Sequence, residues 1–217
     1  MPFCALNRHV SDIEIMPRKS HDLTARKKFH DAIKAGKTVQ ELDFSTLVSF
    51  EDVVRFCSRY RVAKSFKGVI LEDFNHKTVE GYNALFKLFL AWSAFEQFLK
   101  LMGLPQNHTE IKQLFDEYDA TTLCNKIKQY DKKDNFYLFL LSQVNGSHRV
   151  EIEKLLKGKA LNSSYLASAI RHIFAHGQLT PHANKSRPRN VMRICDAISE
   201  FLLQIMDAEF TKRIDKI

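Results

Sequence analysis

One short stretch in the C-terminal third, AIRHIFAHGQL, combines an arginine with two histidines just before a glycine. The residues are Arg171, His172 and His176, and Gly177 follows them directly. A guanidinium matches the charge and the planar geometry of a phosphate group, and imidazole exchanges protons near neutral pH. These residue types therefore suit chemistry at a phosphodiester, where negative charge builds up while protons move on and off oxygen.

A helical wheel divides this stretch into two sides. Its apolar side holds Leu166, Ala169, Ile170, Ile173 and Phe174, which we expect to face a core. Its polar side holds Ser164, Ser168, Arg171, His172 and His176. Among these, His172 and His176 are four residues apart, so they are neighbours on one helix face. Asn162, Ser163 and Ser164 are the candidate N-caps, and Gly177 marks the end of the helix.

Two other interpretations of the same residues have to be considered. Cations suit the C-terminal end of any helix, where each contributes a few tenths to about 1 kcal/mol. The His172 and His176 pair also has a spacing that binds zinc, with His182 as a third ligand. No glutamate sits between the two histidines as it does in H-E-x-x-H, so we predict no metal site.

Basic residues follow in a run without an acid before Asp196. The run consists of Lys185, Arg187, Arg189 and Arg193. We predict that it contacts RNA phosphates, although a solvated loop and helix start would look the same. A second basic cluster, expected to be ordinary surface, comprises Arg55, Arg59, Arg61, Lys64 and Lys67.

The sequence predicts two long helices that would position these residues. Residues 78–102 form a long, mostly apolar helix closed by Gly103 and Pro105. Glu96 falls among apolar residues on its wheel, so we expect it to be a structural residue that meets a cation or a helix end. A final long helix begins between residues 186 and 190, with Pro188 in its first turn.

Shorter helices are predicted around these two. One covers residues 20–36, with Ser20 as its N-cap. Another begins after Ser49, which forms a capping-box pattern with Asp52. The others cover residues 108–119, 121–131, 135–144 and 148–158. Gly146 is expected to break the apolar run before the last of these. A strand stays open for 135–144, and residues 64–74 fit either a short strand or the approach to a helix.

Composition supports an all-α protein able to form a substantial core. The 217 residues are 45% hydrophobic and include 17 Phe, but the chain has few turn-forming residues, with 7 Gly and 5 Pro. A net charge of +8, from 33 basic and 25 acidic residues, favours an anionic partner. Cys4, Cys57, Cys124 and Cys195 form no C-x-x-C pair, so we expect reduced thiols. Neither a signal peptide nor a membrane span is expected, which predicts a cytoplasmic protein.

With these elements in place, the motif resembles that of the HEPN superfamily. Its members are small helical bundles with Arg, four to six residues and then His, usually with a polar residue directly after the Arg. Arg171 and His176 match with a four-residue gap, and His172 is the polar residue. The stretch AWSAFEQFLKLMG resembles the family's first long helix. The resemblance covers residues 76–217 and leaves residues 1–75 as a mostly helical N-terminal extension.

This resemblance implies an up-and-down helical bundle and a metal-independent endoribonuclease that acts as a homodimer in a toxin or defence role. Arg171 would hold the scissile phosphate, His176 would act as general acid and base, and His172 would assist. RNA and a regulatory protein such as an antitoxin are the implied partners, with no cofactor. Some family toxins carry a Tyr two residues after the His as a target for modification, but this chain has Gln178 there. The alternative is a non-catalytic helical module of the same fold that binds nucleotide, RNA or a protein partner.

Overall fold

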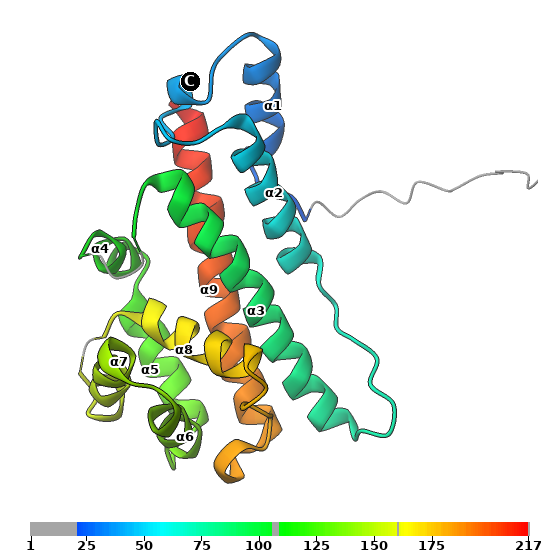
Figure 1. Ribbon diagram of the computed structural model, residues 1–217, viewed down its shortest axis with the longest axis vertical. Coiled ribbons are helices and arrows are strands. Elements are labelled where there is room, and N and C mark those ends of the chain that lie inside the picture. The colour runs from blue at the N-terminus through cyan, green and yellow to red at the C-terminus, as the bar shows by residue number, and fades with distance from the viewer. Residues whose placement is uncertain (1–20, 106–108, 160, 217) are drawn as a thin grey trace, which may run out of the picture.

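The computed structural model describes residues 21–105, 109–159 and 161–216 (Figure 1). Every regular element in these ranges is a helix, which confirms the predicted all-α bundle. The α-helices are α1 (Arg26–Lys34), α2 (Phe50–Ser65), α3 (His76–Met102), α4 (Thr109–Glu117), α5 (Ala120–Tyr130), α6 (Asn135–Gln143), α7 (Gly146–Leu156), α8 (Ser163–Ala175) and α9 (Pro188–Asp215). Two short 3-10 helices, η1 (Gln40–Leu42) and η2 (Ala183–Lys185), complete the described elements.

The two longest helices, α3 and α9, run side by side in the same direction along the whole molecule (Figure 1). Near their starts, which we call the foot of the bundle, Gly81 of α3 lies beside Pro188 of α9. Just before the middle of both helices, Lys87 Nζ lies 2.6 Å from a Glu200 carboxylate oxygen. Pro188 occupies the first position of α9, as predicted, where its missing N–H costs nothing.

The helix α2 packs against α3 and continues the same core. Phe56 of α2 contacts Phe98 of α3 and Phe210 of α9, with ring centroids 6.0 and 5.9 Å apart. The predicted capping box at the start of α2 is confirmed, since Ser49 and Asp52 bond to each other's backbone N–H groups. The core is therefore continuous across the predicted boundary between residues 75 and 76.

Some predicted helix boundaries change. The long helix begins at His76 with Asn75 as its N-cap, two residues earlier than expected. The helix α1 begins at Arg26, and the predicted cap Ser20 lies outside the described residues. Gly146 does end the apolar run, but it is also the first residue of α7. Residues 66–72, which sequence alone left open, contain neither helix nor strand.

The helices α4 to α8 lie on one side of the lower half of the central pair (Figure 1). Within this group α8 packs against α3, while α6 and α7 flank α8. The 135–144 run is a helix, because buried Phe136, Tyr137 and Leu140 share one face at helical spacing. This layer places the arginine and histidine stretch at the end of α8.

The sequence also predicted reduced thiols and no membrane-spanning segment. Cys57, Cys124 and Cys195 are free thiols, while Cys4 lies outside the described residues. Burial raises the pKa of Cys57 and of Cys124 to about 11, so both stay protonated at neutral pH. Across the described part of the chain, no helix has both the length and the apolar character needed to cross a membrane.

Candidate functional site

The start of α8 is built by a polar cap. The Asn162 side-chain oxygen accepts hydrogen bonds from the Ser164 backbone N–H at 3.1 Å and from the Ser164 hydroxyl at 2.7 Å. Asn162 is therefore the N-cap among the three candidates. The predicted place of Ser164 on the outward polar side is wrong, because its side chain is fully buried. The cap explains this burial, since it satisfies the hydroxyl locally and lets the first turn pack inward.

The rest of the wheel holds along α8. Leu166, Ala169, Ile170 and Ile173 are buried, and the partly buried Phe174 packs edge-to-face on Phe86 with centroids 5.1 Å apart. The helix ends in a Schellman motif, in which the Gln178 N–H bonds to the Ile173 carbonyl at 3.1 Å. Gly177 takes the left-handed conformation, with φ of 72°, that this motif requires.

Arg171 leaves the outward side of α8 and reaches Glu96 on α3. Its Nη2 donates to both Glu96 carboxylate oxygens, at 3.2 and 3.4 Å. Trp92, one turn earlier on α3, donates its indole N–H to Glu96 Oε1 at 2.9 Å and so fixes the carboxylate. The expected burial of Glu96 is wrong, since its side chain is 42% exposed, although its partner is a cation as predicted. The wheel describes α3 alone, whereas the exposure of Glu96 depends on how α8 packs beside it.

The guanidinium of Arg171 keeps donors available for a ligand. It lies 5.9 Å from the centre of the Phe89 ring, which supports it from α3. Among the described residues, its hydrogen bonds come from Nη2 alone, so Nε–H and the Nη1 hydrogens have no protein acceptor. With a side chain 33% exposed, Arg171 is held in place while most of its donors stay open to a ligand.

A pocket of about 320 Å³ opens beside Arg171, and we call it the Arg171 pocket. Its wall includes Arg171, His172, Ser168, His148 and the end of α6 at Gln143. His148 Nε2 lies 3.1 Å from Ser168 Oγ, and its ring packs edge-to-face on Tyr165. Burial, and secondarily the neighbouring His172, lowers the pKa of His148, which favours a neutral imidazole.

His148 was missed by sequence reasoning. It lies 20 residues before Ser168 and belongs to another helix, so no spacing within α8 indicates it. The signal that was available is slight: a histidine near the start of a short helix in a basic protein. Ser168, by contrast, was predicted on the polar side of the helix, and its hydroxyl is the group that contacts His148 at the pocket wall.

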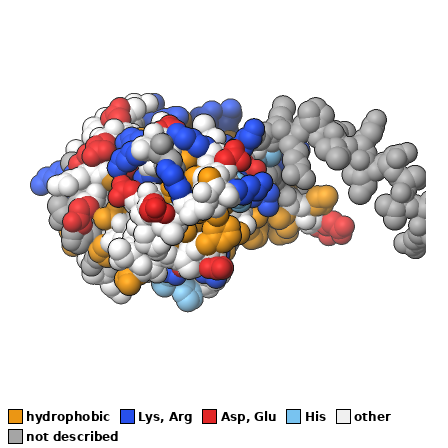
Figure 2. All heavy atoms as spheres, turned by 90° about the horizontal axis from the view of Figure 1, so that it is seen from above, with side chains coloured by type: hydrophobic (Ala, Val, Ile, Leu, Met, Phe, Trp, Pro, Cys, Tyr) orange, Lys and Arg blue, Asp and Glu red, His pale blue; other side chains and the backbone are white. Residues whose placement is uncertain are grey.

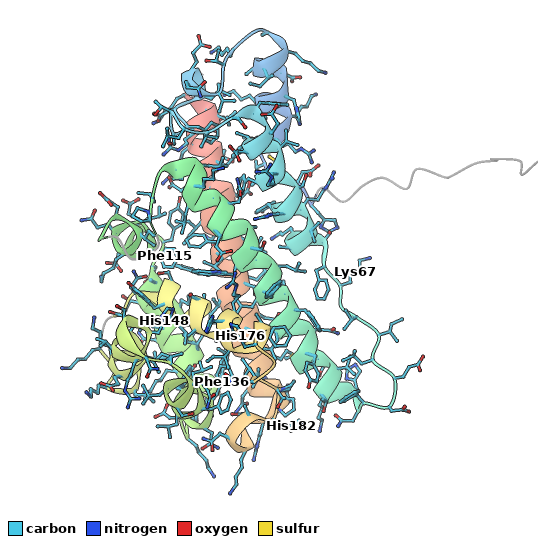
Figure 3. The ribbon with its side chains drawn as sticks, in the orientation of Figure 1. Lys67, Phe115, Phe136, His148, His176 and His182 are labelled. Carbon is cyan, nitrogen blue, oxygen red and sulfur yellow. The ribbon has the colours of Figure 1, made fainter. Side chains whose placement is uncertain are left out.

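The two histidines of α8 form a contacting pair. The rings of His172 and His176 have centroids 4.4 Å apart, and both side chains are exposed. His172 lines the Arg171 pocket, whereas His176 stands next to it at the last turn of α8. The site thus brings one cation and three imidazoles onto one surface, of which Figure 3 labels His148 and His176.

The zinc alternative gains no support from the geometry. His182, the proposed third ligand, lies near the foot of the bundle (Figure 3), with Nε2 3.0 Å from Thr78 Oγ1 on α3. Within the ranges that the structure describes, no three His, Cys, Asp or Glu side chains are grouped so as to hold a metal ion.

The predicted RNA-binding residues lie apart from Arg171. Lys185 and Arg187 line a pocket of about 490 Å³ between the start of α6 and the start of α9, together with Lys132 and Lys133. We call it the α6–α9 pocket. Of the other two predicted residues, Arg193 stacks over Tyr130 at 5.5 Å and Arg189 is exposed outside this pocket.

The second basic cluster lies on α2 except for the exposed Lys67, which follows the helix, and most of its α2 residues contact neighbouring acceptors. Arg55 pairs with Asp52 at 2.9 Å, and Lys64 lies 3.4 Å from Glu200 on α9. Arg59 donates to the Ser93 carbonyl on α3. This arrangement is that of an ordinary helix surface packed beside α3 and α9, as expected.

No protein-family model, curated protein or solved structure matches this chain. The function is therefore inferred from the residues of the two pockets and their chemistry.

Proposed function

We propose that the protein is a metal-independent endoribonuclease of the HEPN type that cleaves RNA at the Arg171 pocket. The observation that carries this proposal is the arrangement of the pocket itself. An arginine with open donors and a histidine line one concave surface, and His176 contacts that histidine. The positive net charge of the chain favours an anionic polymer as substrate.

Each residue type has a defined task in this reaction. The 2′-oxygen of the RNA attacks the adjacent phosphorus, the bond from phosphorus to the 5′-oxygen breaks, and a 2′,3′-cyclic phosphate forms. A base removes the proton of the 2′-OH, and an acid protonates the departing 5′-oxygen. His176 carries this proton transfer with assistance from His172, whose ring is 4.4 Å away. Arg171 stabilises the negative charge that accumulates on the phosphate oxygens.

Glu96 acts as a positioning residue in this proposal. The carboxylate is itself fixed by Trp92, so it holds the Arg171 guanidinium through Nη2 and leaves Nε and Nη1 for the phosphate. A fixed guanidinium loses less rotamer freedom on binding than a free one. The negative charge of Glu96 also weakens the attraction of Arg171 for an anion.

The proposal includes a homodimer in the cytoplasm, with a toxin or defence role and regulation by an antitoxin or similar protein. In a dimer, two Arg171 and His176 sets would share one cleft. The aromatic border of the site suits such an interface, because Phe86, Phe89 and Phe174 are only partly buried beside Arg171.

Incubation of purified protein with single-stranded RNA in EDTA tests the assignment. The expected products carry 2′,3′-cyclic phosphate and 5′-hydroxyl ends, and Arg171→Ala and His176→Ala should each abolish cleavage. Arg61→Ala is the matched control, since Arg61 is a half-exposed arginine on α2 that lies 3.9 Å from the Asp22 carboxylate before α1. Cleavage by Arg171→Ala at the wild-type rate would overturn the catalytic assignment.

A second candidate function is a non-catalytic helical module that binds nucleotide, RNA or a protein partner. The Arg171–Glu96 ion pair favours it, because a compensated arginine is also what a purely structural contact requires. The two functions separate on one result. A binding module retains RNA at an unchanged chain length, whereas a nuclease yields cyclic-phosphate fragments that disappear with Arg171→Ala.

A further inference from the structure

The α6–α9 pocket joins two basic segments that are far apart in the chain. Lys132 and Lys133 come from the turn between α5 and α6, and Lys185 and Arg187 come from the segment that leads into α9. All four side chains are exposed at a cavity of about 490 Å³. Only the second pair belongs to the basic run recognised in the sequence.

Positive charge in this pocket is only partly compensated by the protein. Within the described ranges, none of the four cations forms an ion pair, although most other basic side chains on α2 and α7 do. One carboxylate lines the pocket, that of Asp131. It is buried and accepts the Phe136 backbone N–H at 2.6 Å, so it caps the start of α6. Four cations against one carboxylate leave an excess of positive charge.

Neutral donors are present as well as charge. Ser186 lines the pocket and is only 4% exposed, and its hydroxyl has no hydrogen-bond partner among the described residues. Next to it begins α9, a helix of 28 residues whose N-cap, Arg187, makes no side-chain capping bond. No acidic residue occupies the first turn of α9, so the positive end of its dipole is open to an outside anion.

The two basic segments are held in this arrangement by local contacts. Asn184 donates its side-chain N–H to the Asn135 carbonyl at 3.0 Å, which ties η2 to the start of α6. On the other side, Gly81 of α3 lets Pro181 and Pro188 approach closely, because a Cβ at Gly81 would lie 2.6 Å from Pro181 Cβ. The pocket is therefore part of the packed bundle and does not depend on a free loop.

We propose that the α6–α9 pocket binds a phosphate group, as carried by a nucleotide or by the backbone of an RNA strand. Cations that approach from two sides, a lone buried hydroxyl and an uncapped helix start all supply donors. A terminal phosphate offers three acceptor oxygens to receive them, and successive backbone phosphates of a strand offer two each. A single carboxylate has two oxygens and one charge, so it would leave much of this donor set unused.

This site is separate from the Arg171 pocket, and phosphate binding here does not require that the protein cleaves RNA. The two pockets lie at opposite ends of α6, a helix of nine residues that is about 14 Å long. If the Arg171 pocket proves inactive, the α6–α9 pocket still makes its own prediction.

Calorimetric titration of the full chain with inorganic phosphate tests the proposal, followed by a 5′-nucleoside monophosphate and a short 2′-O-methyl oligonucleotide. The last probe cannot undergo 2′-OH attack, so binding is measured without cleavage. Lys132→Gln/Lys185→Gln should weaken binding of phosphate by about tenfold or more. Lys27→Gln/Lys34→Gln removes the same charge from α1 at the other end of the bundle (Figure 1) and should leave the affinity unchanged.

Chemical shifts give a readout that needs no variant. Phosphate should move the amide signals of Ser186, Arg189 and Asn190 at the start of α9 and leave those of α1 in place. Tighter binding of the mononucleotide would identify a terminal phosphate as the ligand, and tighter, salt-dependent binding of the oligonucleotide would identify a strand. Equal phosphate affinity in the pocket variant and the α1 control, or unmoved signals at α9, would overturn the proposal.

Discussion

The Arg171 pocket and the α6–α9 pocket lie at opposite ends of α6 and differ in whether their basic side chains are paired with acids. In the first, one arginine is paired with Glu96 and surrounded by imidazoles. In the second, four cations share a cavity with a single carboxylate that is engaged elsewhere. The opposite end of the bundle differs from both, since Figure 2 shows acidic and basic side chains intermingled over it.

A paired cation and an unpaired cation serve a bound phosphate in different ways: the first is held in one orientation, and the second attracts the anion more strongly. An ion pair fixes a guanidinium in one orientation, which matters where a reacting phosphate must be held accurately. Unpaired cations attract an anion over a longer range and gain more from binding it, because no internal partner has to be displaced. We therefore propose the Arg171 pocket as the reaction site and the α6–α9 pocket as an anchoring site.

The largest expected effect concerns which histidines belong to the reaction site. His176→Ala should lower the cleavage rate by about 10²–10⁴-fold, because proton transfer at the 2′-oxygen and the 5′-oxygen loses its carrier. His182→Ala is the matched control, since His182 is also exposed but contacts Thr78 at the foot of the bundle. Rates come from gel analysis of labelled RNA, and a His182→Ala loss equal to that of His176→Ala would contradict the site.

A second change disturbs the anchoring site alone. In Gly81→Ala, the new Cβ would lie 2.6 Å from Pro181 Cβ, which pushes the segment before α9 away from α3. Overpacking of this kind costs about 1–3 kcal/mol of unfolding free energy, offset in part by the better helix propensity of Ala.

Urea denaturation measures this loss, and phosphate affinity should fall with it while the Arg171 pocket keeps its activity. Pro181→Gly in the Gly81→Ala background removes the colliding atoms and should recover part of the stability. Full stability in Gly81→Ala would mean that the close approach does not hold the segment.

Glu96→Gln tests whether Glu96 positions Arg171 or only weakens its attraction for RNA. The amide oxygen can still accept from Trp92, but the negative charge beside Arg171 is lost. RNA binding should tighten while the rate at saturating RNA falls by about tenfold, because the guanidinium is less firmly held. Steady-state kinetics separate the two effects as a lower KM together with a lower kcat. An unchanged kcat would show that Glu96 plays no positioning role.

The smallest expected effect is a pH dependence centred on His148. Its pKa is lowered in the folded protein by burial and by His172, so the unfolded chain binds this proton more readily. The stability contributed by neutral His148 is present above its ordinary pKa of 6.5 and is lost as pH falls through the lowered value. Unfolding free energies at pH 7.5 and 5 should therefore differ more for wild type than for His148→Gln, and equal differences would contradict this role.

The helices and the division of α8 into two sides followed from local pattern. Periodicity predicted the buried side of Ile170 and Ile173, Gly177 predicted the helix end, and Ser49 with Asp52 predicted the start of α2. These features depend on neighbours within about one or two helical turns, which a sequence displays directly.

The contacts between helices could not be predicted in the same way. A wheel placed Glu96 in the interior because it describes one helix and does not show how a neighbouring helix packs against it. The partners His148 and Ser168 are 20 residues apart, and Lys132 meets Lys185 across an even longer separation. Such pairs depend on how α6 packs against η2 and how α7 packs against α8, which no local spacing specifies.

Single-turnover cleavage at saturating RNA is the measurement that tests the division of roles most directly. Arg171→Ala should lose about 10²–10³-fold in rate, whereas Lys132→Gln/Lys185→Gln should cleave at the wild-type rate once RNA is saturating. The Lys132→Gln/Lys185→Gln variant should need more RNA to reach saturation. Wild-type cleavage by Arg171→Ala, or a rate loss confined to Lys132→Gln/Lys185→Gln, would contradict the proposed roles of the two pockets.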